Sequence, residues 1–588
     1  MNVLELSEQE IGRRESLQEL RQMGINPYPA AEYPTNAYST DIRDNFNDDA
    51  DPRQVCIAGR MMSRRVMGKA SFAELQDSKG RIQVYISRDD LCPDENKDLY
   101  NKVFKRLLDI GDFIGIKGYV FRTQTGEISV HAQELTLLSK SLKPLPIVKY
   151  KDGVAYDKFE DPELRYRQRY VDLIVNDGVK DTFLQRATVI RTLRRVLDEA
   201  GYTEVETPTL QSIAGGASAR PFITHFNALD QDMYMRIATE LYLKRLIVGG
   251  FEGVYEIGKN FRNEGMDRNH NPEFTCMELY VQYKDYNWMM TFTEKLLETI
   301  CIAVNGKPER EIDGQIISFK APYRRLPILD AIKEKTGFDC NGKSEEEIRA
   351  FCKEKGMDVD ETMGKGKLID ELFGEFCEGT FLQPTFITDY PVEMSPLTKM
   401  HRSKPGLTER FELMVNGKEL ANAYSELNDP IDQEERFVDQ MRLADKGDDE
   451  AMIIDQDFLR ALQYGMPPTS GIGIGIDRLV MLMTAHSYIQ DVLLFPQMRP
   501  EKVAKRDKEE AYVALGVPAE WVAPIQKAGF LTVEALGKLD RPGKLFQDLL
   551  DINKKYKLGL KVPVVDEVKA WVEAAAATLP AEPAEPAE

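Results

Sequence analysis

The chain has 588 residues, of which 42% are hydrophobic and 30% charged, and its formal net charge is −20. This length exceeds the ~250–300 residues at which a single hydrophobic core stops growing, so we expect several domains in a soluble, globular protein. No apolar run approaches the ~18 residues that a membrane span requires, and the acidic start lacks the pattern of a signal peptide. The seven cysteines are scattered with no C-x-x-C pair, which argues against a disulfide framework or a zinc site. We therefore expect a cytoplasmic protein without a membrane partner.

The negative net charge is a weak argument against a nucleic-acid partner, because screening limits the reach of a charge to ~8–10 Å. Between Arg60 and Lys69 the segment RMMSRRVMGK carries four basic residues and no acidic one. A local basic patch is therefore compatible with an acidic protein.

The first part of the chain divides into a helical and a β-rich segment. Residues 1–48 contain a helix-like pattern that ends near GINPYP, and residues 49–143 contain roughly five short strand patterns separated by turns such as DSKG and TQTG. Five short strands in fewer than ~100 residues favour a small closed barrel, with the oligonucleotide-binding (OB) barrel as one option. A plain barrel without a ligand is the alternative.

The rest of the chain is interpreted as a linker, a large mixed domain and a helical end. The linker, punctuated by proline, spans residues 144–172. The mixed region spans residues 173–500 and includes a charged, helix-like surface insertion at about 340–378. Residues 505–574 have a helical pattern, and the low-complexity stretch 575–588 predicts a disordered tail.

The segment FRNEGMDRNHNPEFTCMELY, residues 261–280, predicts a hairpin with one apolar and one charged face. After its turn, apolar residues alternate with polar ones, as in a strand of period two. Buried charges need partners, so we expect the charged face to line a pocket. The residues of that face are Arg262, Glu264, Glu278 and Tyr280. An exposed hairpin with a solvated polar face is the alternative.

A second hairpin is predicted around Asn416-Gly417, a dipeptide typical of two-residue turns. Regular pairing about this turn places Glu412 opposite Ala421 and puts Glu412 and Glu419 diagonally on one face, ~7–8 Å apart. Two carboxylates at that separation favour a hard cation such as Mg²⁺ between them. Two exposed surface glutamates are the alternative.

The sequence leaves open whether Asn422 and Glu426, on the second strand of this hairpin, face the same side as Glu419. In a regular strand, Asn422 and Glu426 lie out of phase with Glu419. A β-bulge near Leu420–Ala421 is the arrangement that would bring both sets of side chains to one pocket.

The third element is TSGIGIGIDRLVMLMTA, in which Gly471, Gly473 and Gly475 alternate with isoleucines before a helix starts near Asp477. The isoleucine face can pack, while the glycine face lets a flat ligand approach the backbone. Arg478, at the start of the helix, is placed for a phosphate. The spacing is not G-x-G-x-x-G, so a dinucleotide fold is not indicated. Tight sheet packing is the alternative explanation of the glycines.

These three elements, together with GYTEVETPTL, resemble the motifs of class II aminoacyl-tRNA synthetases. FRNEG, HNPEFT, GGASARPF and SELNDP are similar to segments of the bacterial lysyl-tRNA synthetase family, as are AGRMMSRRVMGKASFAELQD and RYRQRYVDL. The resemblance covers most of residues 50–500. It implies an α+β fold, in which an N-terminal OB-fold barrel binds the anticodon and a catalytic domain is built on an antiparallel sheet. It also implies a homodimer whose interface includes the region around Pro208.

The resemblance implies roles for individual residues. It assigns Mg²⁺ to Glu412 and Glu419. Arg262 and Arg478 are implied to be catalytic through stabilisation of phosphate charge. The residues implied to contact ATP are Arg262, Glu264, His270, Phe274 and Arg478. The residues implied to bind lysine are Gly216, Glu240, Arg262, Glu278, Tyr280, Asn422 and Glu426, and those implied to read anticodon bases are Phe72, Gln83 and Glu134.

The implied activity is lysine–tRNA ligation. ATP and L-lysine give lysyl-adenylate and pyrophosphate, and lysine then passes to the 3′ end of tRNA(Lys) with release of AMP. The residues favour this amino acid independently, because Glu240, Glu278 and Glu426 make a pocket for a ligand with more than one positive charge. A catalytically inactive, synthetase-derived tRNA-binding or regulatory protein is the alternative. An enzyme that lysylates another acceptor is disfavoured, because the barrel fits tRNA.

The stretch after Arg499 departs from the compact pattern of the family. LGVPAEWVAPIQKAGFLTVEALGKL has the rhythm of short helices joined by a tight turn that contains glycine. A helix-hairpin-helix module and a small helical bundle are two alternatives for this small helical C-terminal extension, whose partner the sequence does not indicate.

Overall fold

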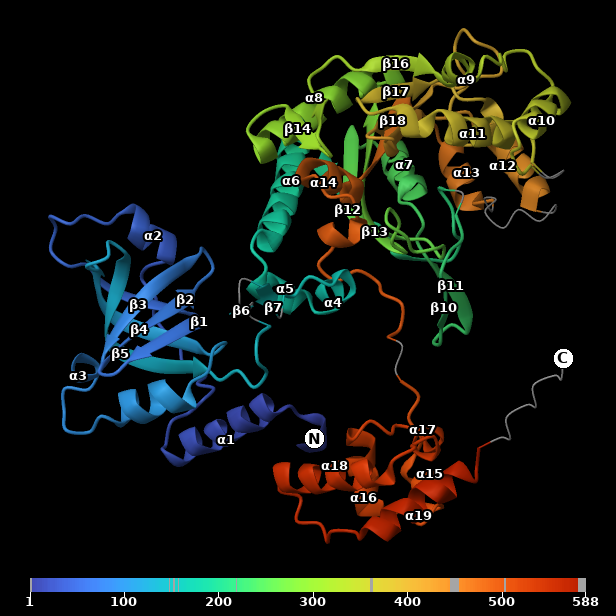
Figure 1. Ribbon diagram of the computed structural model, residues 1–588. Helices are drawn as coiled ribbons and strands as arrows, with labels where there is room; N and C mark the ends of the chain where they lie inside the picture. Colours follow the sequence, from blue (N-terminus) through green and yellow to red (C-terminus); the bar gives the residue numbers. More distant parts are fainter. Residues whose placement is uncertain are drawn as a thin grey trace. The chain divides into compact units, whose positions relative to one another are not determined.

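The computed structural model contains two compact units, formed by Met1–Lys158 with Pro500–Glu588 and by Phe159–Arg499 (Figure 1). Helices and antiparallel-rich sheets occur in both, so the predicted α+β fold class is confirmed. Across the described ranges, no helix is long and apolar enough to cross a membrane. The structure describes residues 3–146, 149–151, 154–156, 158–217, 219–359, 363–444, 454–501 and 504–579.

A short helical segment precedes the barrel of the first unit. Helix α1 (Glu8–Gln22) starts at a capping box, in which the Ser7 side chain accepts the backbone N–H of Glu10 and the Glu10 carboxylate accepts the N–H of Ser7. Leu17 and Leu20 are buried on one side of α1. The other helical pieces here are η1 (Val3–Glu5) and α2 (Ser39–Asp44).

Five strands close into a barrel in the order β1-β2-β3-β5-β4, in which β3 and β5 run parallel. Along β3, buried and half-exposed residues alternate, with Ile82, Val84 and Ile86 in the barrel core. This order and closure correspond to the OB architecture expected from the sequence. The strands are β1 (Gln54–Met67), β2 (Ala70–Gln76), β3 (Arg81–Ser87), β4 (Phe113–Arg122) and β5 (Ile128–Ser139), with α3 (Arg88–Leu91) and the π-helix η2 (Leu99–Leu107) between β3 and β4.

The last helices of the same unit share a hydrophobic core of their own. Trp521, Leu549 and Trp571 are buried in it. A shared core of this kind fits the small-bundle alternative for the extension. The helices are α15 (Glu509–Val513), α16 (Ala519–Lys527), α17 (Val533–Gly537), α18 (Pro542–Lys555) and α19 (Val565–Ala576). The first two residues of the expected tail, 575–588, belong to α19, and residues 580–588 lie outside the described residues.

The segment expected to be a linker, residues 144–172, contains regular structure. Its second half belongs to the Phe159–Arg499 unit, where Arg169 is buried and donates hydrogen bonds to the Asp172 carboxylate and the Gln490 carbonyl. The linker therefore ends earlier than expected, because Pro162 stands at the start of a helix, a position that tolerates proline, and does not mark a break. The elements are β6 (Lys149–Lys151), β7 (Val154–Tyr156), α4 (Pro162–Arg167) and α5 (Arg169–Val175).

An eight-stranded sheet forms the centre of the second unit, in the order β16-β17-β18-β19-β20-β13-β12-β8. Its interior pairs are antiparallel, and only the two edge pairs, β16·β17 and β12·β8, are parallel. The strands are β8 (Thr203–Glu204), β12 (Gly253–Phe261), β13 (Glu273–Gln282), β16 (Arg324–Pro327), β17 (Thr385–Thr388), β18 (Arg410–Val415), β19 (Lys418–Ser425) and β20 (Thr469–Gly475).

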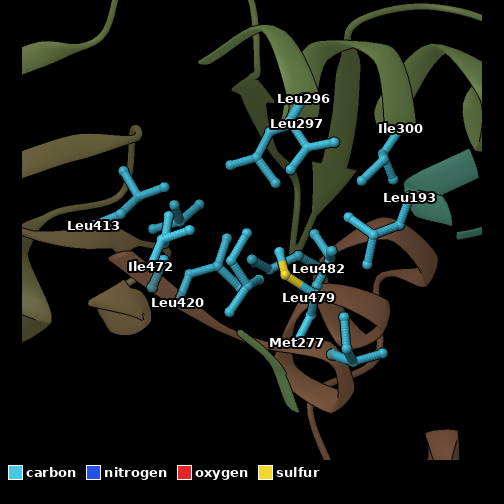
Figure 2. Close-up of a cluster of buried hydrophobic side chains, with 14 of the residues drawn as sticks. Leu193, Met277, Leu296, Leu297, Ile300, Leu413, Leu420, Ile472, Leu479 and Leu482 are labelled. Carbon is cyan, nitrogen blue, oxygen red and sulfur yellow. The ribbon is translucent and has the colours of Figure 1, made fainter. Parts of the chain in front are cut away.

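Helices α6 (Val179–Glu199), α8 (Tyr286–Asn305) and α14 (Ile476–Thr484) cover one face of this sheet. Figure 2 shows side chains from these helices, among them Leu193, Leu297 and Leu479, gathered with Met277 and Ile472 of the sheet. All five side chains are almost completely buried. Residues of opposite parity on the same strands point to the other face, which carries the candidate site.

Smaller elements surround the sheet. The segment expected to be a surface insertion, residues 340–378, carries α10 and α11, whose Ile348, Leu368 and Phe373 share a separate core. The remaining elements are α7 (Glu240–Val248), β9 (Leu210–Gln211), β10 (Ile223–Phe226), β11 (Gln231–Met235), β14 (Glu309–Ile312), β15 (Gln315–Ser318), α9 (Ile328–Thr336), α10 (Glu345–Glu354), α11 (Lys365–Phe376), η3 (Glu378–Thr380), η4 (Val392–Met394), α12 (Pro430–Ala444), α13 (Gln456–Gln463) and η5 (Ile489–Val492).

Candidate active site

A cavity of about 560 Å³ lies on the open face of the eight-stranded sheet. Its walls come from β12, β13, β18, β19 and β20, from the first turns of α7 and α14, and from the loop around Ser395. The candidate site residues of this unit that line it are Gly216, Glu240, Arg262, Glu264, His270, Phe274, Glu278, Tyr280, Glu412, Glu419, Asn422 and Arg478. Glu426 is not among the lining residues. The sequence motifs therefore meet in one place although they are far apart along the chain.

The strand β13 shows the expected alternation. Met277 and Leu279 are buried in the core beneath the sheet, while Glu278 and Tyr280 line the cavity. The Glu278 carboxylate accepts the backbone N–H of Thr239 at 3.1 Å and the Tyr280 hydroxyl at 3.1 Å. Burial, together with the neighbouring carboxylate of Glu240, raises the pKa of Glu278.

Arg262 supplies an unpaired positive charge to the cavity. It follows the end of β12, so it lies at the turn and not on the strand where the sequence pattern put it. Its guanidinium lies 5.2 Å from the centroid of the Phe274 ring. Among the described residues, no carboxylate lies within ion-pair distance of Arg262, and its buried Nε has no hydrogen-bond partner. A half-buried cation whose Nε has no partner among these residues favours an anionic ligand.

A second cation, Arg478, stands at the start of α14. Its guanidinium contacts the carboxylate of Glu419 at 3.3 Å and His270 Nε2 at 3.2 Å. His270 in turn contacts Asp267 through Nδ1 at 2.9 Å. The exposed Glu264 lines the cavity in the same turn region.

The β18–β19 hairpin corrects one detail of the predicted pairing. Glu412 pairs with Asn422, not with Ala421, because the register shifts between Leu413 and Met414. The extra residue is Leu420, so the bulge considered from the sequence is present. As a result Glu412, Glu419 and Asn422 all line the cavity.

The carboxylate pair Glu412 and Glu419 has the donor chemistry that Mg²⁺ prefers. Arg410 contacts the Glu412 carboxylate at 2.5 Å and donates to the Asn422 side-chain oxygen at 3.1 Å. Burial raises the pKa of Glu412 to about 7; the positive charge of Arg410 opposes this rise, and the negative charge of Glu419 adds to it. No group of three or more potential metal ligands occurs in the described part of the chain. The pair fits an ion that takes its other ligands from phosphate and water. Arg410 was not a sequence candidate, although it lies two residues before Glu412 on the same face of β18.

A buried cation, which the sequence did not reveal, contacts carboxylates at the acidic end of the cavity. Glu240 is the first residue of α7, and its carboxylate accepts the hydroxyl of Tyr424 at 2.6 Å. Lys244, one turn later, contacts Glu240 Oε1 at 2.5 Å and also contacts Glu426. Its side chain is fully buried. The spacing of four residues from Glu240 was the available signal.

The glycines of β20 serve two purposes. A Cβ at position 471 would lie 2.3 Å from Glu426 Oε1 and 2.4 Å from the Tyr280 ring, so this glycine is required by packing. A Cβ at position 473 would meet nothing closer than 3.8 Å, so Gly473 leaves open space in the cavity. Both explanations considered from the sequence therefore apply, each at a different residue. Gly216 has a φ of +89°, a conformation that favours glycine.

The three candidate anticodon residues lie on the barrel. Phe72 on β2 pairs with Tyr85 on β3, with ring centroids 5.3 Å apart, and Gln83 donates to Ser129 at 3.0 Å. Glu134 on β5 is exposed and bonded to Lys117 at 2.7 Å. Phe72 and Tyr85 belong to a cluster of half-exposed rings that the sequence analysis did not identify. Its members are Phe72, Tyr85, Tyr119, Phe121 and His131.

The fold and the cavity agree with two family matches. Residues 161–499 match the family of class II tRNA synthetases (D, K and N), and residues 55–138 match the OB-fold nucleic acid binding domain. The first match covers more than half of the chain. An antiparallel sheet with a charged cavity on one face and an OB barrel before it thus define a class II aminoacyl-tRNA synthetase.

Similar proteins show which synthetase family within this class the chain belongs to. Lysine–tRNA ligases from two strains of Porphyromonas gingivalis are 66% identical over 576 residues, which cover 98% of this chain and 100% of theirs. The lysine–tRNA ligase of Azobacteroides pseudotrichonymphae is 66% identical over 498 residues, 85% of this chain and 100% of its own. That of Christiangramia forsetii is 63% identical over 507 residues, 86% of this chain and 89% of its own. The chain belongs to the lysine–tRNA ligase family.

Proposed function

We propose that this synthetase activates L-lysine with ATP and Mg²⁺ and then transfers the lysyl group to the 3′ end of tRNA(Lys). The proposal rests on the two different ends of one cavity. One end has the unpaired Arg262 and the carboxylate pair Glu412 and Glu419, and the other end is lined by Glu240 and Glu278. The first end suits a polyphosphate with its metal, and the second suits ammonium groups. No feature of the site favours the inactive alternative.

ATP is proposed to bind along the first end. Phe274 would stack on adenine, Glu264 and His270 would contact the nucleotide, and Arg478 would bind the γ-phosphate. Arg262 would bridge the α-phosphate and the lysine carboxylate, since its Nε lacks a protein partner among the described residues. Mg²⁺ held by Glu412 and Glu419 would neutralise phosphate charge and polarise the phosphoryl oxygens.

Lysine is proposed to bind in the acidic end. Gly216 and Glu240 would receive the α-amino group. The residues assigned to the lysine side chain are Glu278, Tyr280, Asn422 and Glu426. Glu426 would act from beside Gly471 and Tyr280, which line the cavity, since its Oε1 lies 2.3 Å from where a Cβ at position 471 would stand.

The reaction needs no covalent nucleophile from the protein. A lysine carboxylate oxygen attacks the α-phosphorus, the bond to the bridging oxygen breaks, and pyrophosphate leaves. The terminal ribose hydroxyl of tRNA then attacks the acyl carbon, AMP leaves with the bonding electron pair, and the hydroxyl proton passes to the phosphate or to water. Alignment of the reactants and the fixed charges of Arg262 and Arg478 are the protein's contribution.

The barrel extends the proposal to tRNA. Phe72 would stack on an anticodon base, and Gln83 and Glu134 would bind base edges. We also infer a homodimer with an interface around Pro208 and operation in the cytoplasm.

Aminoacylation tests the proposal. Purified full-length protein is incubated with ATP, Mg²⁺, radiolabelled lysine and a tRNA(Lys) transcript, and acid-precipitable label is counted. We expect lysine-dependent charging of this transcript and none of a transcript with a different anticodon and acceptor stem. Folded protein that charges no transcript would contradict the proposal.

A further inference from the structure

Lys244 is a buried cation with no assigned part in the reaction. Its side chain is 0% exposed, and its ammonium contacts two of the carboxylates assigned to lysine binding, Glu240 and Glu426. It does not line the cavity. Burying an ammonium is costly, so its presence behind a substrate pocket calls for a reason.

The groups around Lys244 come from several elements. Glu240 comes from its own helix, and Glu426 follows β19. The aromatic rings of Tyr424 on β19 and Phe458 on α13 lie 5.6 and 5.8 Å from the ammonium. Glu278 and Tyr280 on β13 complete the acidic end. The next basic residue of α7, Arg245, contacts Asp455 instead.

The pKa of Glu426 is raised well above its usual range, and Lys244 is the cation in contact with it that opposes this rise. Burial and the neighbouring carboxylates of Glu240 and Glu278 push the pKa of Glu426 upward, and the Lys244 ammonium opposes that shift. Apart from Lys244, neither oxygen of Glu426 has a hydrogen-bond partner among the described residues. The two carboxylates raise the pKa of Lys244 against the effect of burial, so it stays an ammonium.

The charges of the acidic end can be counted. The acidic end has three carboxylates, those of Glu240, Glu278 and Glu426, and one internal ammonium, which contacts Glu240 and Glu426. If all are ionised, two negative charges remain without a partner. Free lysine brings two ammonium groups, and its carboxylate has Arg262 as a separate partner.

We propose that Lys244 is a specificity-determining positioning residue, a built-in counter-cation that fixes the uncompensated charge of the pocket at two, the number of ammonium groups on the substrate. The inference rests on the proposed function, because it takes lysine as the ligand of this pocket. Lys244 favours the ionised form of Glu426, whose pKa burial and the neighbouring carboxylates raise, so lysine binding has less work to do in displacing a proton from the pocket.

Replacing Lys244 by methionine removes the charge and keeps the length of the side chain. Three crowded carboxylates would then retain a proton, and lysine binding would have to release it. The KM for lysine is expected to rise at least tenfold at pH 6.5, and the variant-to-wild-type ratio of KM should fall by up to about tenfold per pH unit toward pH 8.5. Taking the ratio cancels the titration of free lysine. The kcat of adenylate formation should change little.

The experiment is ATP–pyrophosphate exchange with full-length protein between pH 6.5 and 8.5, with calorimetric titration of lysine as a second readout. Lys140→Met is the matched control, since Lys140 is also fully buried between two carboxylates, Asp109 and Asp112, but in the barrel. The ratio of the KM for lysine of this control to that of the wild type should stay near one at every pH. The double variant Lys244→Met/Glu426→Gln again has two uncompensated carboxylates, those of Glu240 and Glu278. Its variant-to-wild-type ratio of KM for lysine should therefore no longer depend on pH.

The outcomes distinguish a failure of the proposed function from a failure of the role of Lys244. Wild-type protein without lysine-dependent exchange contradicts the proposed function itself. Normal wild-type exchange with a pH-independent ratio for Lys244→Met overturns only the role of Lys244 and leaves a structural ion pair. If the single variant does not fold, recovery of folded protein in the double variant supports the charge count, and failure of both variants contradicts it.

Discussion

Arg262 and Glu412 carry opposite charges into the cavity, and each is in an environment that favours a ligand. The Arg262 Nε is buried without a partner in the described part of the chain, and burial raises the pKa of Glu412 to about 7. A phosphate with its metal would supply both missing partners, because the phosphate pairs with the Arg262 guanidinium and the metal ion keeps the Glu412 carboxylate ionised. The identities of both residues were accessible from the sequence. Arg410, two residues before Glu412 on the same face of β18, was also within reach of the sequence pattern, whereas the approach of Arg262 to the Phe274 ring depends on the fold of the hairpin.

Replacing Arg262 by alanine should abolish most adenylate formation. The variant loses the charge proposed to stabilise the α-phosphate in the transition state, so kcat is expected to fall by roughly 10²–10³. The measurement is lysine-dependent ATP–pyrophosphate exchange, with the melting temperature as a check on folding. Arg195→Ala, on the exposed side of α6, is the control and should leave the rate unchanged. A folded Arg262→Ala variant with a normal rate would remove Arg262 from the mechanism.

The requirement for Mg²⁺ should depend on pH through Glu412. Because its pKa is raised to about 7, Glu412 holds a proton below that pH, and the metal must displace it. The Mg²⁺ concentration for half-maximal exchange is therefore expected to fall between pH 6 and 7.5, by up to roughly tenfold per unit, and to level off above. The Glu412→Gln variant should need more Mg²⁺ at every pH and lose this dependence. The control, Glu311→Gln at an exposed position, should follow the wild type; an unchanged profile in Glu412→Gln would contradict the assignment.

At the scale of elements, the periodicity of the strands predicted many of the residues that line the cavity. The alternation of β13 predicted which residues face the cavity, because a strand has only two faces. The bulge at Leu420 was visible only as an unresolved alternative, since one extra residue in a strand leaves no local signature in composition. Glu426 forms an ion pair with Lys244, which comes from α7, an element that is distant in sequence. Pattern analysis of single segments has no access to such a contact.

The glycines of β20 should respond differently to the same substitution. Gly471→Ala places a methyl group 2.3 Å from Glu426 Oε1, so the free energy of unfolding should fall by roughly 1–3 kcal/mol. Gly473→Ala fits at 3.8 Å and should cost little stability, while Gly473→Val should raise the KM for lysine or ATP by filling the cavity. Chemical denaturation and exchange kinetics measure the two effects. Equal stability losses at 471 and 473 would contradict the division between packing and binding.

At the scale of the whole molecule, we propose separate tasks for the barrel and the sheet. The sequence predicted both, because short alternating strands and the motif hairpins are local patterns. It placed the end of the linker too late, since α4 and α5 are short helices whose anchoring by Arg169 is tertiary. The ring cluster of the barrel was also missed, because Tyr85 and His131 meet across strands that are not consecutive.

A barrel variant should therefore separate activation from charging. Phe72→Ala removes a proposed stacking surface worth about 1–3 kcal/mol per base, so the KM for tRNA(Lys) should rise roughly 5- to 150-fold. Lysine-dependent exchange without tRNA should be unaffected. Tyr38→Ala, an exposed aromatic outside the ring cluster, is the control and should change neither reaction. Loss of exchange in folded Phe72→Ala, or normal charging by it, would count against the division of tasks.

The central claim is that the cavity activates lysine, and ATP–pyrophosphate exchange with each standard amino acid tests it most directly. Purified full-length protein is assayed with ATP and Mg²⁺ in the absence of tRNA. We expect exchange with lysine and with no other amino acid at comparable concentration, because only lysine satisfies both the acidic end and Arg262. Exchange with a different amino acid, or no exchange from folded protein, would contradict it.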